Sequence, residues 1–191
     1  MSLTPKQCYE VLDLHYRQCL EEETARLRAE MEFHLRHTKG VFAICQEITC
    51  ALPPEQRKEL DQDLLSAAAI LHDVAKFDGA GEHNRAARRV IADHLDLLGW
   101  DDSQEYLPAL ADIIAAHRGE EFEPKQDWVR EAAVLRLADK LDMRRRGMDK
   151  KEQFKESRKL IRNYFQRFPE ESREARFLSA LLETVKALPT S

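Results

Sequence analysis

The sequence predicts an all-α fold, a bundle of helices, on three observations. Apolar residues recur every three or four positions along almost the whole chain, which is the spacing of one helix face. Only six of the 191 residues are glycine, so breaks within helices are expected to be few. β-branched residues never accumulate in the alternating runs that are typical of strands.

The first half of the chain predicts four helices. Thr4 and Pro5 provide an N-cap and a proline at the first helical position, which open a long polar helix. A second helix follows and ends at Pro53-Pro54, and Gly99 closes the fourth. These helices are expected over residues 4–31, 33–52, about 55–77 and about 82–98.

The second half of the chain predicts four more helices. Asp101-Asp102-Ser103 can cap the first of them, which stops at Gly119. Pro169 divides the last stretch into two helices because proline cannot continue a helix. The expected helices cover residues 101–117, about 127–143, and two segments before and after Pro169.

Length and composition describe one compact domain, to which further helices can be attached. The formal net charge of −5 argues against general attraction to nucleic acid, and no nucleic-acid partner is expected. The four cysteines lack the spacing of a zinc finger, so reduced thiols in a cytoplasmic protein are expected. No stretch approaches the roughly 18–20 apolar residues that span a bilayer, so no membrane contact is expected.

Four of the predicted helices place an ionisable side chain on an apolar, inward-facing stripe. Such groups are costly to bury unless each has a partner. Neighbours in a helix point about 100° apart, so an adjacent histidine and aspartate can serve two positions. The residues concerned are His37, His72 with Asp73, His117 and Asp139, and the loop after Gly81 adds His83.

Each of these residues has a simpler explanation when it is taken alone. A histidine on an apolar stripe is commonly a hydrogen-bonded core residue, and Asp139 can form an ion pair with Arg136 or Lys140. Together they are most economically explained by one shared metal centre. Mixed imidazole and carboxylate ligands suit Mn²⁺, Fe²⁺, Zn²⁺ or Ni²⁺. The remaining histidines, His15, His34 and His94, are expected to be solvated.

The order of these residues, H…HD…D, resembles the signature of the HD-domain metal-dependent phosphohydrolases. The similar stretches are "RHTKGVFAICQEI", "AAAILHDVAKF" and "VLRLADKLD", and the resemblance covers about Arg36 to Met143. It implies an all-α HD-domain bundle. We expect one domain over residues 1–191, with a core at about 32–145, an N-terminal helix at 4–31 and C-terminal helices at 148–188.

Two further stretches, "GEHNRAARRVI" and "IIAAHRGE", extend the order to H-HD-H-H-D, which resembles the two-metal branch of that superfamily. Within this branch the chain looks most like the small bacterial symmetrical diadenosine tetraphosphate hydrolases. The resemblance implies that Asp73 bridges two divalent transition-metal ions. Iron or manganese is expected, with zinc, nickel, magnesium or cobalt as alternatives. The implied ligands are His37, His72, Asp73 and Asp139 for one ion, and Asp73, His83 and His117 for the other.

The activity implied is hydrolysis of a nucleotide phosphoester or phosphoanhydride, with dinucleoside polyphosphates among the expected substrates. A hydroxide between the two ions would attack phosphorus, with Asp73 and Lys76 as the catalytic residues. Lys76 stands where the single-metal nucleotidases of the superfamily carry glutamate, and it would hold a phosphate oxygen or the hydroxide. Arg118 and Arg144 are candidates for binding further phosphates.

Two other functions remain open from the sequence. One is a sensor that keeps the metal site without useful hydrolysis, and the other is oxygen-dependent chemistry at a di-iron centre. A hydrolase should release its product without oxygen, whereas a di-iron oxygenase should consume it. A homodimer is a further expectation, since aromatic residues of the C-terminal helices suit either internal packing or a dimer surface.

Overall fold

The computed structural model describes residues 4–19, 25–78, 82–99, 106–148 and 151–189. All regular secondary structure in these ranges is helical, so the prediction of an all-α fold is confirmed. The helices are α1 (Pro5–Cys19), α2 (Ala25–Ala51), α3 (Pro54–Arg57), α4 (Gln62–Leu71), α5 (His83–Ala92), α6 (Leu95–Leu98), α7 (Tyr106–Ala115), α8 (Val129–Arg145), α9 (Lys151–Phe165) and α10 (Arg173–Ala187), with a 3₁₀ turn at Gln126–Trp128.

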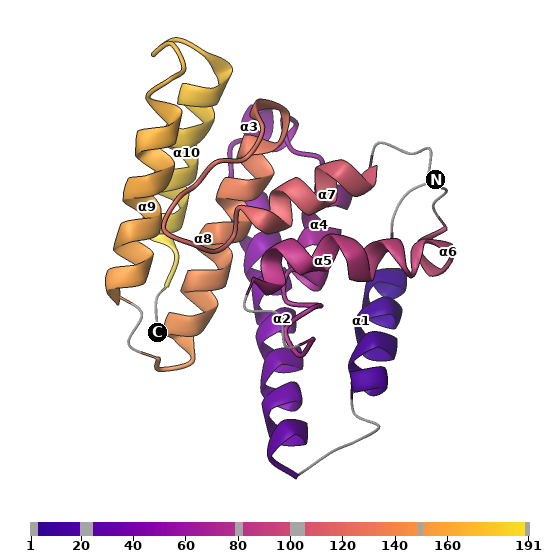
Figure 1. Ribbon diagram of the computed structural model, residues 1–191. Helices are drawn as coiled ribbons and strands as arrows, with labels where there is room; N and C mark the ends of the chain where they lie inside the picture. Colours follow the sequence, from indigo (N-terminus) through magenta and orange to yellow (C-terminus); the bar gives the residue numbers. More distant parts are fainter. Residues whose placement is uncertain (1–3, 20–24, 79–81, 100–105, 149–150, 190–191) are drawn as a thin grey trace.

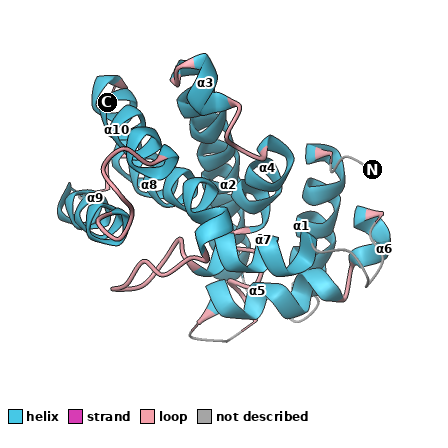
Figure 2. Cartoon of the chain, turned by 90° about the horizontal axis from the view of Figure 1, so that it is seen from above, coloured by secondary structure: helices cyan, strands magenta, loops and turns pink. Residues whose placement is uncertain are grey.

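The centre of the bundle is formed by α2, α4, α7 and α8, which pack on one another. The helix α1 lies against α4 on one side, and α9 and α10 lie along α8 on the opposite side (Figures 1 and 2). The last eight residues of α4, Leu64 to Leu71, are all buried. Three consecutive alanines in this stretch let neighbouring helices approach closely, because methyl side chains occupy little space.

Several predicted helices are shorter than expected or divided. The prediction of one helix over residues 4–31 is wrong, because α1 ends at Cys19 and α2 already starts at Ala25. Residues 20–24 lie outside the described ranges. The segment 82–98 is divided between α5 and α6. The proposed cap at Asp101–Ser103 also lies outside the described residues, whereas the two C-terminal helices lie on either side of Pro169 as predicted.

The most important difference concerns the helix expected over 55–77. Asp61 caps a new helix by accepting a hydrogen bond from the Leu64 amide at 3.0 Å, so α4 is separate from α3. The helix then ends at Leu71, and successive turns follow. In these turns the Lys76 amide donates to the Asp73 carbonyl at 2.9 Å, three residues back. His72 and Asp73 therefore lie at a helix end, where the backbone changes direction.

None of the helices in the described ranges has the length and apolar character needed to cross a membrane.

Glu131 on α8 is a buried carboxyl group whose effect on the free energy of unfolding can be measured. Its side chain accepts a 2.8 Å hydrogen bond from the Asp61 amide, and burial raises its pKa to about 7 despite that bond. A carboxyl group with a raised folded-state pKa stabilises the fold below its unfolded pKa, near 4.5, and this contribution is lost as the pH rises through 7.

We therefore expect Glu131→Gln to be more stable than the parent at pH 8, by about 1–3 kcal/mol, and to differ little at pH 5. Glutamine keeps an oxygen that accepts from Asp61 and carries no charge. Urea unfolding at the two pH values measures the difference, with Glu183→Gln on the exposed face of α10 as the control. Identical pH dependence in the parent and Glu131→Gln would contradict the expectation.

Candidate metal centre

Four separate parts of the bundle bring the predicted ligands to one buried place. His37 comes from the middle of α2, and Asp139 comes from α8. His83 is the first residue of α5, and the other three residues follow the C-terminal ends of α4 and α7. The exposed fraction of each residue is 5% or less. The set that the structure brings together is His37, His72, Asp73, His83, His117 and Asp139.

Three of the histidines are oriented by hydrogen bonds from the ring nitrogen that faces away from the cluster. His72 Nδ1 lies 2.8 Å from the Ala69 carbonyl, and His117 Nδ1 lies 2.6 Å from the Ile114 carbonyl. Both rings fold back on the last turn of the helix they follow. Since a carbonyl only accepts, these rings carry their proton on Nδ1 and direct the Nε2 lone pair into the cluster, as metal-binding histidines do.

His37 has the same orientation with a carboxylate partner. Its Nδ1 lies 2.7 Å from Oδ2 of Asp142, while its Nε2 lies 3.2 Å from Oδ1 of Asp139 and 3.4 Å from Nε2 of His72. A carboxylate behind a ligating imidazole fixes its orientation and raises its basicity. Three groups thus converge on one point beside α8.

The two oxygens of Asp73 face different halves of the cluster. Oδ1 lies 2.8 Å from Nε2 of His83 and 3.8 Å from Nε2 of His117. Oδ2 lies 3.7 Å from Nε2 of His72 and 3.3 Å from Nδ1 of His34. Asp73 therefore stands between the histidine pair on one side and the His72 side of the cluster on the other.

The electrostatics keep the carboxylates charged and two imidazoles neutral. Burial raises the pKa of Asp73, but the surrounding imidazoles outweigh it and hold the pKa well below its usual range. Burial raises the pKa of Asp139 as well, and Lys140 and His37 reverse this effect. Burial lowers the pKa of His72, and burial together with His72 lowers that of His117 to about 3. Charged carboxylates and neutral imidazoles are the forms that bind metal ions.

The donor set fits divalent cations. Ligand atoms of His37, His72 and Asp73 all lie within 4.8 Å of one another, and so do those of Asp73, His83 and His117. Asp73 belongs to both groups. Imidazole nitrogens and carboxylate oxygens without thiolate suit first-row divalent metals such as iron, manganese, zinc or nickel.

The sequence profile of the HD domain matches residues 35–144, which is more than half of the chain. The chain belongs to the HD-domain family. The matched range differs by one residue at each end from the range of the sequence resemblance.

The chain is also similar to a 3′-5′ exoribonuclease, YhaM, of Shouchella clausii (strain KSM-K16). The two are 32% identical over 105 residues, which cover 48% of this chain and 33% of the exoribonuclease. The HD-domain chain thus spans about one third of the length of this relative. No solved structure matches the chain.

A cavity of about 190 Å³ opens beside the HD-domain cluster. Lys76 and Arg118, two of the predicted phosphate-binding residues, line it. Lys76 Nζ lies 4.0 Å from Asp73 Oδ2, and a guanidinium nitrogen of Arg118 lies 2.7 Å from Nδ1 of His83. Arg144, the third predicted residue, is not among the described residues that line this cavity, and its guanidinium lies over the ring of Phe154.

The assignment of three histidines to the solvated class is wrong. His94 is buried and bonded to the Val90 carbonyl, and His15 lies 2.6 Å from Asp78. His34 lines the cavity and faces Asp73. In the sequence, the position of His34 one turn before His37 was the sign that it could reach the site. Only the packing of α2 against the turn after α4 brings it there.

Two further residues of α8 lie at the site, and only Lys140 was expected from the sequence, as an ion-pair partner of Asp139. Lys140 Nζ lies 2.5 Å from Asp139 Oδ2 and lines the cavity. Asp142 is buried behind His37 and also lies 2.5 Å from Nε of Arg146. Its spacing of three residues from Asp139 was a signal, because such residues share a helix face.

We expect Asp142→Asn to weaken metal affinity by about 10–100-fold, because the loss of an outer-shell carboxylate has effects of this size. Metal titration monitored by calorimetry measures the change. Arg146→Gln is the matched control, since it removes the other partner of Asp142 and leaves the contact with His37. Equal weakening in the two variants would assign the effect to the α8 ion pair and contradict the role of Asp142 behind His37.

Proposed function

We propose that this HD-domain protein hydrolyses a phosphoester or phosphoanhydride bond of a nucleotide at a centre of two divalent metal ions. His37, His72, Asp73 and Asp139 would hold one ion, and Asp73, His83 and His117 the other. When bound, such a pair of cations would neutralise phosphate oxygens and lower the pKa of bound water. Iron or manganese is the proposed metal, with zinc, nickel, magnesium or cobalt as alternatives.

The position of Asp73 supports the proposal most strongly. A carboxylate with one oxygen toward His83 and His117 and the other toward His72 suits a bridging ligand. A site for one ion would need only one of these two groups. The family's hydrolytic character and this double set of donors together favour hydrolysis over a purely structural metal site.

The residues around the cavity have separate roles in the proposal. The Lys76 ammonium, 30% exposed at the side of Asp73, would hold a phosphate oxygen as a point charge. Arg118, fixed beside His83, would neutralise a second phosphate. Burial of all six ligands limits access of bulk water to the reacting phosphate.

The substrate class has two candidates. A dinucleoside polyphosphate of the diadenosine tetraphosphate type is favoured by the motifs around His72 and His117. The 3′-terminal phosphodiester of an RNA is favoured by the similarity to an exoribonuclease. This second candidate departs from the expectation, based on net charge, that nucleic acid is not a partner, because one strand end can be bound locally by an acidic protein.

Hydrolysis by the purified chain, loaded with Mn²⁺ or Fe²⁺, tests the proposal. The substrates are diadenosine tetraphosphate, ribonucleoside triphosphates, a cyclic dinucleotide and a short RNA with a free 3′ end. We expect oxygen-independent hydrolysis of at least one of them, abolished by chelator and reduced in Lys76→Ala. Tight binding without turnover would favour the sensor function, and oxygen consumption would favour the oxygenase. Either result would overturn the proposal.

A further inference from the structure

Two larger cavities adjoin the metal-centre cavity, and Arg118 lines all three. One, of about 500 Å³, lies between the start of α5, the end of α7 and the loop that follows α7. The other, of about 800 Å³, lies between that loop, α8 and α9, and we call it the α9 groove. The residues that line the α9 groove are Arg118, Gly119, Glu120, Arg136, Lys140, Gln153, Glu156, Ser157 and Leu160.

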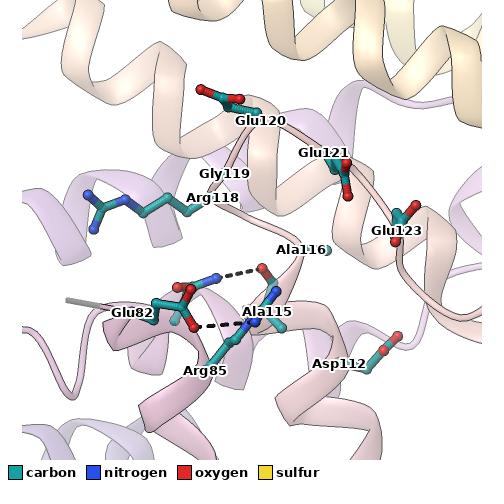
Figure 3. Close-up of a pocket in the computed structure, with 11 residues that line it drawn as sticks. Glu82, Arg85, Asp112, Ala115, Ala116, Arg118, Gly119, Glu120, Glu121 and Glu123 are labelled. Atoms are coloured by element: carbon teal, nitrogen blue, oxygen red, sulfur yellow. Dashed lines mark hydrogen bonds and ion pairs between the residues drawn. The ribbon is translucent and has the colours of Figure 1, made fainter. Parts of the chain in front are cut away.

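The cavity beside α5 has the wrong charge for a nucleotide. Figure 3 shows three glutamates spread along the loop from Ala116 to Glu123, with Glu82 and Asp112 below them. Five carboxylates stand against two guanidiniums in this lining, and Arg85 already pairs with Glu82 at 3.3 Å. A polyphosphate or a strand of RNA entering here would meet net repulsion.

The α9 groove has the opposite balance and is continuous with the metal-centre cavity. Its lining has three cationic side chains against the carboxylates of Glu120 and Glu156. Lys140 and Gln153 line both the groove and the cavity that holds the predicted metal ligands. A nucleotide whose phosphate lies at the metals can therefore extend its nucleoside part along α9.

The floor of the groove is held in place by Arg136. This guanidinium is 3% exposed and donates to Ser157 Oγ on α9 at 3.2 Å and to the Gly119 carbonyl at 2.6 Å. It also donates to the Ala116 and Glu121 carbonyls at 3.1 and 2.9 Å. One side chain of α8 thus ties α9 to the loop, so that the groove exists before any ligand enters. A preformed site loses less conformational entropy when it binds.

The groove depends on a part of the chain outside the HD-domain match, which ends at residue 144. The helix α9 supplies the amide of Gln153, the carboxylate of Glu156 and the half-buried apolar surface of Leu160. Two adjacent hydroxyl groups are good partners for one carboxylate, because it offers two acceptor oxygens. An apolar side chain one turn further along the helix suits the face of a base.

We propose that the α9 groove binds the ribonucleoside of the substrate, with Glu156 accepting hydrogen bonds from the ribose 2′ and 3′ hydroxyls and Leu160 contacting the base. This inference rests on the proposed function, because it places the phosphate at the metal centre. It adds that the C-terminal extension determines specificity for ribose. A dinucleoside polyphosphate and the 3′ end of an RNA both present such a ribose.

Binding to the full-length, metal-loaded chain tests the groove without turnover. Calorimetry would give dissociation constants for the four ribonucleoside 5′-monophosphates, their 2′-deoxy counterparts and inorganic phosphate. In the parent we expect at least one ribonucleotide to bind about tenfold tighter than both its 2′-deoxy form and phosphate. Glu156→Ala should remove this preference and leave phosphate affinity unchanged. The control is Glu152→Ala, on the same helix and outside the groove lining, which should leave all affinities unchanged.

Equal affinity for ribonucleotides and phosphate in the parent would overturn the proposed role of the α9 groove. A preference for ribose that persists in Glu156→Ala would overturn it as well. Failure of the proposed function gives a different result. Ribonucleotides would then bind with the expected dependence on Glu156, but no substrate would be hydrolysed. Far-ultraviolet circular dichroism of each variant confirms that α9 is retained.

Discussion

Replacing Asp73 by asparagine is expected to reduce the rate of hydrolysis by more than about 100-fold. Loss of a residue that only hydrogen-bonds to a metal ligand reduces activity by about 100-fold at most, and loss of a ligand shared by two ions should cost more. The carboxylate faces both halves of the cluster, through Oδ1 to His83 and through Oδ2 to His72. An amide keeps the size of the side chain and removes the charge. Both proposed ions would therefore lose a ligand at once.

Steady-state hydrolysis of the best substrate and metal content after dialysis measure this effect. Asp78→Asn is the matched control, because Asp78 is another shielded aspartate in the segment after α4, paired with His15 and Arg89. That variant should keep activity within a few-fold of the parent. Comparable losses in the two variants would mean that the charge of this segment supports folding, and would contradict a bridging role for Asp73.

Loss of one of two metal ions is the expected result for the double variant His83→Ala, His117→Ala. Of the carboxylate oxygens in the cluster, these two histidines contact only Oδ1 of Asp73. Their removal therefore leaves the donors of the first ion, His37, His72 and Asp139, in place. Elemental analysis of protein purified without chelator should give about two ions per chain in the parent and about one in the variant, as a dinuclear hydrolase site requires. Activity should fall with the second ion.

His94→Ala is the control for removing a buried histidine. His94 is bonded to the Val90 carbonyl and does not belong to the described groups of candidate ligands, so its variant should retain both ions. One ion per chain in the parent and in the double variant alike would contradict the dinuclear site. His83 and His117 would then have a structural role only.

The six candidate ligands could be named from the sequence because each breaks an apolar pattern or belongs to a short motif. His37 and Asp139 interrupt stripes on long helices, where period 3.6 makes the inward face readable. His72 was expected in the interior of a helix and His117 as the last residue of one, and both lie just beyond the ends of α4 and α7. The change does not move them from the site, because the rings fold back on the last turn.

The partners of these residues could not be predicted, because they depend on contacts between distant segments. His37 meets Asp142 across 105 positions of sequence, and His34 reaches Asp73 only where α2 crosses the turn after α4. A helix face with both polar and apolar residues does not indicate which polar residue turns inward. The α9 groove could not be predicted either, because Arg136 joins three segments that no local pattern connects.

By itself, the sequence determined the helical class, the HD-domain order of motifs and the identity of the six candidate ligands. These properties are local: helical periodicity and short motifs depend on neighbours within one or two turns. Only the tertiary structure decided which oxygen of Asp73 faces which histidine, which ring nitrogens point inward, and which cavity beside Arg118 carries the positive charge. Packing of non-adjacent helices fixes these relations, because distances and burial between them arise only when the core forms.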